Sequence, residues 1–371
     1  MEKIVWITED AFVDCDIIPI DQVSKRYMIE WIVIHPLKKS RYTENEINKF
    51  HQGNNNVNTH LFYEKYSAKD LRKIHEYFKL GKQAVKYSGT LYYVNYSVAL
   101  PWYIFFWGQL PSKKIITAHQ GAVHVGMKNK WLSAFSRDSI YKKAKFVNMF
   151  STSQAELFKQ RYKKSTIIII NLALKDYGLP SVKNASSADD TIYFLSFGYI
   201  NYAKNIDLLI DAACNLYDRG VRGFKVMIYG KCQDWSFYER RIRYPELFEL
   251  GIDFIKNKDI PNLFSKAHYF VQPYRVVSQS GAMKVAFQYN TPVIASNLPG
   301  LADELEEGIN GFAFDTENIS DLERVMSERI KLFKTEYNLL IDRMKKYTEE
   351  HYSPEHIGAE YLKMFENTLK Y

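Results

Sequence analysis

Short runs of β-branched and aromatic residues alternate with longer amphipathic segments along the chain. Such runs predict strands, and apolar positions three or four residues apart predict helices. The strands expected in the first half are Lys3–Thr8, Glu30–His35, His60–Tyr63, Lys114–Ala118, Phe146–Ser151 and Thr166–Asn171. Those expected in the second half are Ile192–Phe197, Lys225–Tyr229, Ile252–Ile255, Tyr269–Gln272, Pro292–Ala295 and Phe312–Phe314. This alternation predicts an α/β protein with two parallel-sheet domains.

Two features sharpen this plan. The four isoleucines at 167–170 lack polar alternation, which is typical of a strand buried on both faces of a parallel sheet. Helices are expected at 204–217, 282–289 and 320–334.

The domain boundaries follow from local composition. The small polar residues at 180–190 indicate a linker or a surface loop at the start of the second domain. Ser353, Pro354 and Glu355 predict the capped start of a last helix. We therefore expect domains over 1–173 and 174–352, with a helix over 353–371 that packs back on the first domain.

Composition excludes several classes of protein. The chain has 371 residues, 46% of them apolar, which suits two folded domains and excludes a disordered chain. Three isolated cysteines (Cys15, Cys214 and Cys232) argue against a disulfide scaffold and a cysteine zinc site, and favour a reducing compartment. No signal peptide and no apolar stretch of about 20 residues is found, so a cytoplasmic location is expected. No GxGxxG or Walker motif occurs, which argues against nicotinamide dehydrogenases and P-loop kinases.

The formal net charge of +8 is concentrated in one segment. Residues 128–164 contain ten basic and two acidic residues, so the rest of the chain is neutral on balance. Residues 127–146 can be drawn as a basic amphipathic helix with Trp131, Phe135 and Ile140 near one side. We expect this segment to meet an anionic membrane surface, making the protein peripheral on the inner face of the cell membrane; a solvated face balancing anionic substrates is the alternative. Nucleic acid is not expected as a partner, because no binding module accompanies the charge.

The stretch from Phe270 to Glu307 carries the strongest chemical signal. A strand ends at Pro273, and a loop leads through Ser278 and Ser280 to Gly281 and a helix. The free amides at such a helix start suit a phosphate group, although an ordinary capped helix has the same local features.

This stretch resembles the donor-site segment of family 4 glycosyltransferases of the GT-B fold, in its Ser-Gln-Ser-Gly loop variant. The resemblance rests on FLSFGYINYAKNIDLLIDAA, VMIYGK, IPNLFSKAHYFVQPY, NTPVIAS and LPGLADELEEGINGFAF, in that order over residues 190–330, and on ITAHQ at 116–120. It implies two Rossmann-like domains that face a cleft. It also implies a hexosyltransferase that uses a nucleoside-diphosphate sugar, without any cofactor or metal.

The resemblance also assigns residues. It places His119 and Lys204 at the catalytic centre, with Lys204 as the cation near the diphosphate. The residues expected to bind the nucleotide sugar are Gly198, Lys204, Gly230, Ser278, Gln279, Ser280, Gly281, Gly300 and Glu304. Without the resemblance, Lys204 and Glu304 would be surface charges, and His119 and His124 would be structural histidines.

Three positions depart from the family pattern. Val277 and Val285 stand where the family usually has two glutamates, and Tyr199 stands where it has an arginine. On the first-domain side, Gln120 replaces an acidic residue, and Glu9 and Asp10 begin a loop that has no glycine. The Asp14-Cys15-Asp16 triplet spells a metal motif of the other glycosyltransferase fold, but we expect a structural role for it here.

Two functions are therefore carried forward. The first is a retaining glycosyltransferase that moves a sugar from a nucleoside diphosphate to a glycan or lipid-linked glycan in cell-surface polysaccharide synthesis. The second is a non-catalytic homologue that binds nucleotide sugar or partners a transferase. A GT-B epimerase is disfavoured, because carboxylates are scarce in the expected cleft.

Overall fold

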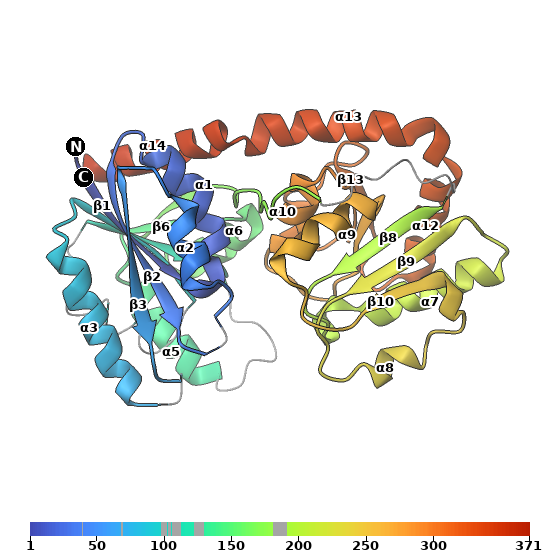
Figure 1. Cartoon of the computed structure of the whole chain (residues 1–371), viewed down its shortest axis with the longest axis horizontal. Coiled ribbons are helices and arrows are strands. Elements are labelled where there is room, and N and C mark those ends of the chain that lie inside the picture. Colours follow the sequence, from blue (N-terminus) through green and yellow to red (C-terminus); the bar gives the residue numbers. More distant parts are fainter. Residues whose placement is uncertain are drawn as a thin grey trace. The chain divides into compact units, whose positions relative to one another are not determined.

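The computed structural model describes residues 1–38, 40–67, 70–97, 102, 105, 113–121, 130–180 and 191–371. The chain divides into two compact units (Figure 1). The first unit combines residues 1–173 with 353–371, and the second comprises residues 174–352. Each unit is built around one parallel sheet.

The first unit contains a seven-stranded sheet in the order β3-β2-β1-β4-β5-β6-β7. Its strands are β1 (Lys3–Glu9), β2 (Met28–Pro36), β3 (Val57–Glu64), β4 (Leu91–Asn95), β5 (Lys114–Ala118), β6 (Phe146–Met149) and β7 (Thr166–Ile169). The strand order reverses between β1 and β4, so the loops after these two strands diverge to opposite sides.

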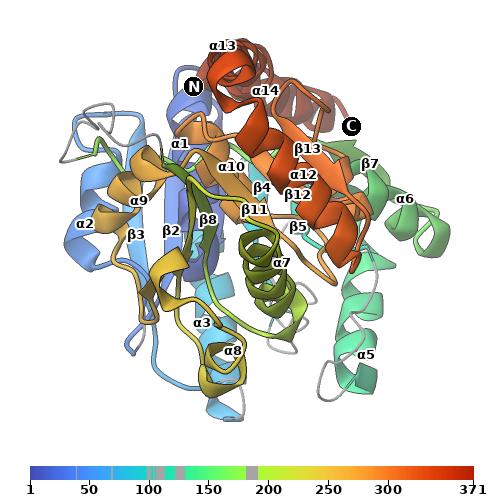
Figure 2. The same cartoon turned by 90° about the vertical axis from the view of Figure 1, so that its right-hand side faces the viewer.

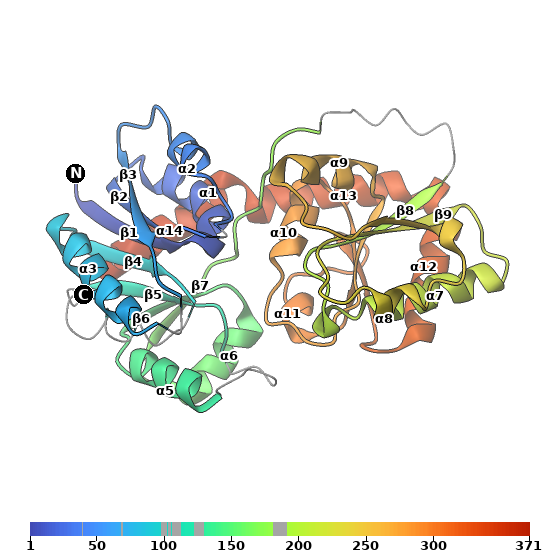
Figure 3. The same ribbon diagram turned by 60° about the horizontal axis from the view of Figure 1, so that its bottom comes forward.

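Helices cover both faces of this sheet (Figure 3). The helices are α1 (Val13–Val23), α2 (Glu44–Phe50), α3 (Arg72–Lys86), α5 (Lys130–Tyr141), α6 (Thr152–Arg161) and α14 (Pro354–Leu369). Apolar residues of α3, α5 and α6 form one core with the side chains of β1, β4 and β5. On the other face α14 packs against α1, and the Trp6 ring lies 5.6 Å from the rings of both Tyr361 and Phe365.

The second unit contains a six-stranded sheet in the order β10-β9-β8-β11-β12-β13. Among these strands, Figure 2 labels β8, β11, β12 and β13. Its strands are β8 (Ile192–Phe197), β9 (Phe224–Tyr229), β10 (Phe248–Gly251), β11 (Tyr269–Gln272), β12 (Val293–Ser296) and β13 (Gly311–Phe314). Its helices are α7 (Ile206–Asp218), α8 (Ser236–Glu239), α9 (Ile260–Lys266), α10 (Gly281–Gln288), α11 (Pro299–Ala302), α12 (Ile319–Lys331) and α13 (Phe333–Tyr352). Helices α7 and α12 pack on one face, and the Phe264 ring of α9 packs on the other against Phe270.

The predicted fold class of two Rossmann-like parallel-sheet domains is confirmed, but three strand predictions were wrong. Strand β4 was missed, although it is central and entirely buried. Strand β10 precedes the predicted Ile252–Ile255, where the Asp253 carboxylate instead accepts from the Phe254 amide. Strand β7 lies at the sheet edge, where Ile169 is 41% exposed, so its isoleucines are not buried on both faces.

The basic amphipathic helix also differs from its prediction. Helix α5 ends at Tyr141 rather than continuing to 146, and Phe135, expected on the apolar side, is 52% exposed. Arg137 is buried instead, with Ile140 and Tyr141. The apolar side of α5 is therefore rotated relative to the predicted one, because Arg137 occupies part of the buried face.

The contact between α14 and α1 can be tested at Gly358. A methyl group added at Gly358 would lie 2.4 Å from Cβ of Gln22. Gly358→Ala should therefore lower the free energy of unfolding by about 1–3 kcal/mol, measured by urea denaturation. At a helix position with free space, the same change raises stability by up to about 1 kcal/mol. A stabilised Gly358→Ala protein would contradict the close packing, and Ala359→Gly on the exposed side of α14 calibrates the helix-propensity term.

Candidate functional site

The strand order of the second unit reverses between β8 and β11. In open parallel sheets, ligands bind beyond the carboxyl ends of the strands at such a reversal. The loop after β8 contains Gly198 and Lys204, and the loop after β11 leads to the start of α10 at Gly281. The structure therefore brings these sequence-predicted residues to one edge of the sheet.

Two glycines allow the strand ends to approach each other closely. Gly198 and Gly230 follow β8 and β9 and have φ values of 118° and 152°, which side chains disfavour. A Cβ atom on Gly230 would lie 1.8 Å from the carbonyl oxygen of Gly198. Gly198 borders a narrow hollow beside Lys204, which Tyr199 and Tyr274 also line.

Arg275 ties the two loops together. Its backbone amide donates to the carbonyl of Ala203 (2.9 Å), and its guanidinium donates to the carbonyl of Tyr202 (2.9 Å). The same guanidinium pairs with Asp207 (2.8 Å) and Glu317 (3.1 Å). Because the bond to Asp207 is bidentate and only partly exposed, it holds the first turn of α7 and the β11 loop in one arrangement.

Lys204 and the start of α10 are connected through Tyr274. The Lys204 ammonium lies 3.6 Å from the centroid of the Tyr274 ring. The Gln272 side-chain amide donates both to the Tyr274 hydroxyl (3.0 Å) and to the Ser280 hydroxyl (2.6 Å). A buried polar chain therefore fixes the cation and the helix start together.

Ser280 caps α10. Its hydroxyl accepts from the Met283 amide (3.3 Å), and its side chain is buried. For the amides of Gly281 and Ala282, no acceptor is found in the described part of the chain. Gly300 of α11 supports this loop, since a Cβ there would lie 2.5 Å from the carbonyl oxygen of Ser278. The arrangement offers two amides and the positive end of a helix to an anion.

Glu304 lies in the interior of the unit rather than on a solvated helix face. Its carboxylate forms an ion pair with Lys284, and it accepts from the Tyr352 hydroxyl (2.8 Å). Lys284 also donates to the Tyr352 hydroxyl (2.9 Å). Burial lowers the pKa of Lys284 well below its usual value. The observed role of Glu304 is to tie α10 to the end of α13. Its contact with a sugar donor stays a prediction.

Sequence analysis missed several residues of this site. Tyr274 and Arg275 contact residues that are distant in sequence, which no local pattern signals. The partners of Gln272 are local, but no motif marked its side chain. Asn205 was also missed: it is fully buried with a φ of 52°, and its side-chain nitrogen and oxygen have no hydrogen-bond partner among the residues that the structure describes. Of the residues that sequence analysis did single out, Val285 is buried in α10, and Gln279 lies half-buried in the loop before this helix.

In the first unit, His119 belongs to a hydrogen-bonded network at the carboxyl ends of β4 and β5. Its ring stacks on Phe12, with 4.0 Å between centroids, and its Nε2 lies 2.8 Å from Oδ1 of Asn95. The Asn95 amide donates to Asp16 (2.9 Å), which also accepts from the Thr8 hydroxyl (2.7 Å). Burial raises the pKa of Asp16 to about 7, against the lowering effect of these hydrogen bonds.

The acidic residues after β1 hold loops in place. Glu9 accepts from Ser97 and Trp102, and burial raises its pKa. Asp10 accepts from the Ser40 hydroxyl (2.5 Å) and from the Arg41 amide (2.8 Å). Asp14 pairs with Arg41 (3.0 Å) at the start of α1.

Within the described ranges, no group of three or more His, Cys, Asp or Glu side chains is placed to hold a metal. His124 lies outside the described residues.

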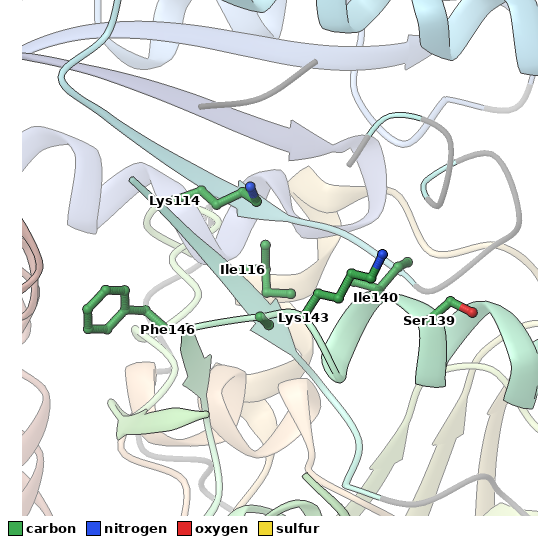
Figure 4. A pocket seen from close by; sticks show the side chains of 7 residues that line it. Lys114, Ile116, Ser139, Ile140, Lys143 and Phe146 are labelled. Atoms are coloured by element: carbon green, nitrogen blue, oxygen red, sulfur yellow. The ribbon is translucent and has the colours of Figure 1, made fainter. Parts of the chain in front are cut away.

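The described part of the basic segment lines a pocket of about 270 Å³ (Figure 4). Ile116, Ile140, Ala144 and Phe146 form its apolar lining, and Lys114, Ser139 and Lys143 add polar groups. Burial lowers the pKa of Lys114. Lys114 and Phe146 are the first residues of β5 and β6, so this pocket is near the amino ends of the strands, away from His119.

Comparison with known proteins defines the class. Residues 181–350 match the family model described as "Glycosyl transferases group 1". A glycogen synthase from Thermodesulfovibrio yellowstonii is 24% identical over 191 residues, which cover 50% of this chain and 37% of the relative. One from Pseudomonas syringae pv. tomato is 23% identical over 135 residues, 36% of this chain and 27% of the relative. The matches thus span about a third of these relatives.

Solved structures match over the whole chain. Sucrose-phosphate synthase from Thermosynechococcus elongatus is 13% identical with a TM-score of 0.74, covering 100% of both chains. HepE from Anabaena in complex with UDP is 14% identical with a TM-score of 0.71, covering 99% of this chain and 100% of its own. The fold is therefore GT-B, and residues 181–350, most of the second unit, are similar to the group 1 glycosyl transferase family model.

The raised pKa of Asp16 predicts a pH dependence of stability. A carboxyl group with a pKa of about 7 in the folded protein and 3.8 unfolded binds more protons when folded between these values. The free energy of unfolding should therefore fall as pH rises from about 4 to 7. In Asp16→Asn, whose amide can still accept from Asn95 and donate to Thr8, this part of the slope should vanish. Urea denaturation of both proteins at several pH values measures the difference, and identical slopes would contradict the assignment.

Proposed function

We propose that this chain is a retaining, family 4 type hexosyltransferase. It would move a sugar from a nucleoside diphosphate to a glycan or lipid-linked glycan in cell-surface polysaccharide synthesis. The group 1 family match and the GT-B fold support this assignment. The solved complexes of HepE with UDP and UDP-glucose, proteins of the same fold, support a nucleotide sugar as the donor.

One observation carries the proposal. The Lys204 ammonium and the free amides at the start of α10 are held by one buried chain of polar contacts at the strand reversal of the second unit. This combination of a cation and helix amides suits a diphosphate, because both groups stabilise phosphate oxygens.

The chemistry required of these residues is electrostatic. As the bond between the sugar and the diphosphate breaks, negative charge develops on the leaving phosphate, and the sugar acquires oxocarbenium character. Lys204 and the amides of Gly281 and Ala282 would stabilise that charge. Each such contact is worth about 2–4 kcal/mol in the transition state.

A second function is favoured by two specific residues. Val277 and Val285 replace glutamates that the family pattern places near the sugar and ribose hydroxyls. A homologue that binds a nucleotide sugar without transferring it would retain the diphosphate contacts and lack these carboxylates. Micromolar binding of nucleotide sugars without hydrolysis or transfer would establish this function in place of the first.

Lys204→Ala tests the diphosphate assignment. A thermal-shift screen of nucleoside diphosphates and their sugars first identifies the sugar donor. With that compound, kcat/KM of the variant should fall about 30-fold to 1,000-fold, because the cation that opposes the leaving charge is lost. The melting temperature should change little, since Lys204 is only half-buried. Lys331→Ala removes an exposed charge from α12 as a control, and unchanged kinetics in Lys204→Ala would refute the role.

The basic segment 128–164 is proposed to meet an anionic membrane surface. The side chains of Lys142, Lys143 and Lys145 are exposed at the end of α5, and Lys143 borders the apolar pocket. Cations beside an apolar lining suit an anionic lipid. Among the described residues, no helix is long and apolar enough to cross a bilayer.

Liposome flotation tests this surface. The protein should float with vesicles that contain 30% phosphatidylglycerol and stay unbound with pure phosphatidylcholine, because each lysine contributes about 1 kcal/mol near an anionic surface. Reversal of Lys142, Lys143 and Lys145 to glutamate should abolish binding. The same reversal at Lys331, Lys345 and Lys346, which are exposed in the second unit, controls for net charge. Equal loss in both variants would show that only the overall charge matters.

A further inference from the structure

The segment Lys175–Gly178 runs alongside helix α10 in the second unit. The Tyr289 hydroxyl, at the end of α10, accepts from the Tyr177 amide (3.0 Å) and donates to the Gly178 carbonyl (3.1 Å). These two bonds anchor the segment at the carboxyl end of the helix. Lys175, two residues before Tyr177, then lies at the opposite end of α10.

The Lys175 side chain occupies the space beside Gly281. A Cβ atom on Gly281 would lie 3.0 Å from Nζ and 3.2 Å from Cε of Lys175. Lys175 is only 8% exposed, so its ammonium is held in this position rather than spread into solvent. The glycine at the first position of α10 therefore leaves room for a buried cation at the start of the helix.

This location places a buried ammonium beside the start of a helix. The start of a helix carries a partial positive charge, so carboxylates and phosphates are stabilised there. An anion bound at the amides of Gly281 and Ala282 would therefore meet both the helix start and the Lys175 ammonium. The ammonium and the helix would then stabilise the anion together, as at other phosphate sites.

The family pattern has a cation in the loop after β8 that this chain lacks, and Lys175 can supply a positive charge in its place. The position after Gly198, at which the resemblance places an arginine, is Tyr199, which carries no charge. Lys204 would otherwise be the one cation that sequence analysis assigns to a phosphate group. Lys175 comes from a part of the chain that the matched motifs do not include, since these begin at residue 190.

We propose that Lys175 binds the diphosphate of the nucleotide sugar, as a second cation that complements Lys204. The proposal rests on the proposed function, because it assigns a residue to the same nucleotide site. It specifies which part of the ligand the residue recognises: the phosphates, and not the base or ribose. Tyr289 is then a positioning residue, since it anchors the segment that carries the lysine.

The experiment compares ligands with and without phosphates. UDP binding is measured by isothermal titration calorimetry, and uridine binding by saturation-transfer NMR. Lys175→Met should weaken UDP about 10-fold to 100-fold, the usual effect of losing one charge-assisted hydrogen bond, and leave uridine unchanged. Lys175→Arg should retain UDP affinity to within about threefold, because it keeps the charge. Lys331→Met, an exposed lysine of the same unit, is the matched control for net charge.

The outcomes separate this proposal from the proposed function. If the wild-type protein binds none of the nucleoside diphosphates in the thermal-shift screen, the proposed function fails, and this assignment fails with it. If the wild-type protein binds UDP and Lys175→Met binds it equally well, only the role of Lys175 is overturned. Equal weakening of UDP and uridine in Lys175→Met would show a structural role and also overturn it. A melting temperature within a few degrees of wild type establishes that the variant is folded.

Discussion

The arrangement of the candidate site depends on the ion pair between Arg275 and Asp207. Parallel strands deliver their loops to one edge of the sheet, but they do not fix the loops relative to each other. Arg275 does so by joining the loop after β11 to the backbone at Tyr202 and Ala203 and to the first turn of α7. The pair is partly shielded and bidentate, so it contributes more than an exposed ion pair would. Lys204 lies immediately after these residues, so its position follows from this contact.

Several polar groups of the site bond to one another, whereas Oε1 of Gln272 and the Asn205 side chain have no hydrogen-bond partner among the described residues. Gln272 serves two hydroxyls at once, and Ser280 serves both the glutamine and the helix. Such mutual bonding holds polar atoms in place at little cost, because buried polar groups without partners are unfavourable. It also explains why the start of α10 keeps its first amides for a ligand: the capping hydroxyl is already bound to Met283.

Local sequence signals made much of the fold and part of the candidate site predictable. Features that depend on contacts between residues distant in sequence could not be predicted. The runs at β8 and β11, the glycines after the strands and the Ser353–Pro354 cap each carry a local signal, and the structure has the corresponding elements. Strand β4 (LYYVN) also carries a local strand signal, but it was missed because the run is short and rich in tyrosine. The isoleucines of β7 were assigned to an interior strand because a sequence does not reveal which strand lies at the sheet edge. The burial of Arg137 and Glu304, and the partners of Tyr274 and Arg275, depend on residues far away in the chain.

The position of α14 has a consequence for how the protein is made. Trp6 and Tyr93 belong to the first half of the sequence, yet the rings that cover them, Tyr361 and Phe365, belong to its last turns of helix. During synthesis on the ribosome, the first sheet therefore emerges with an uncovered aromatic face. That face stays open until the whole second unit has been translated. The core on this face of the first sheet is therefore completed only when α14 has been made.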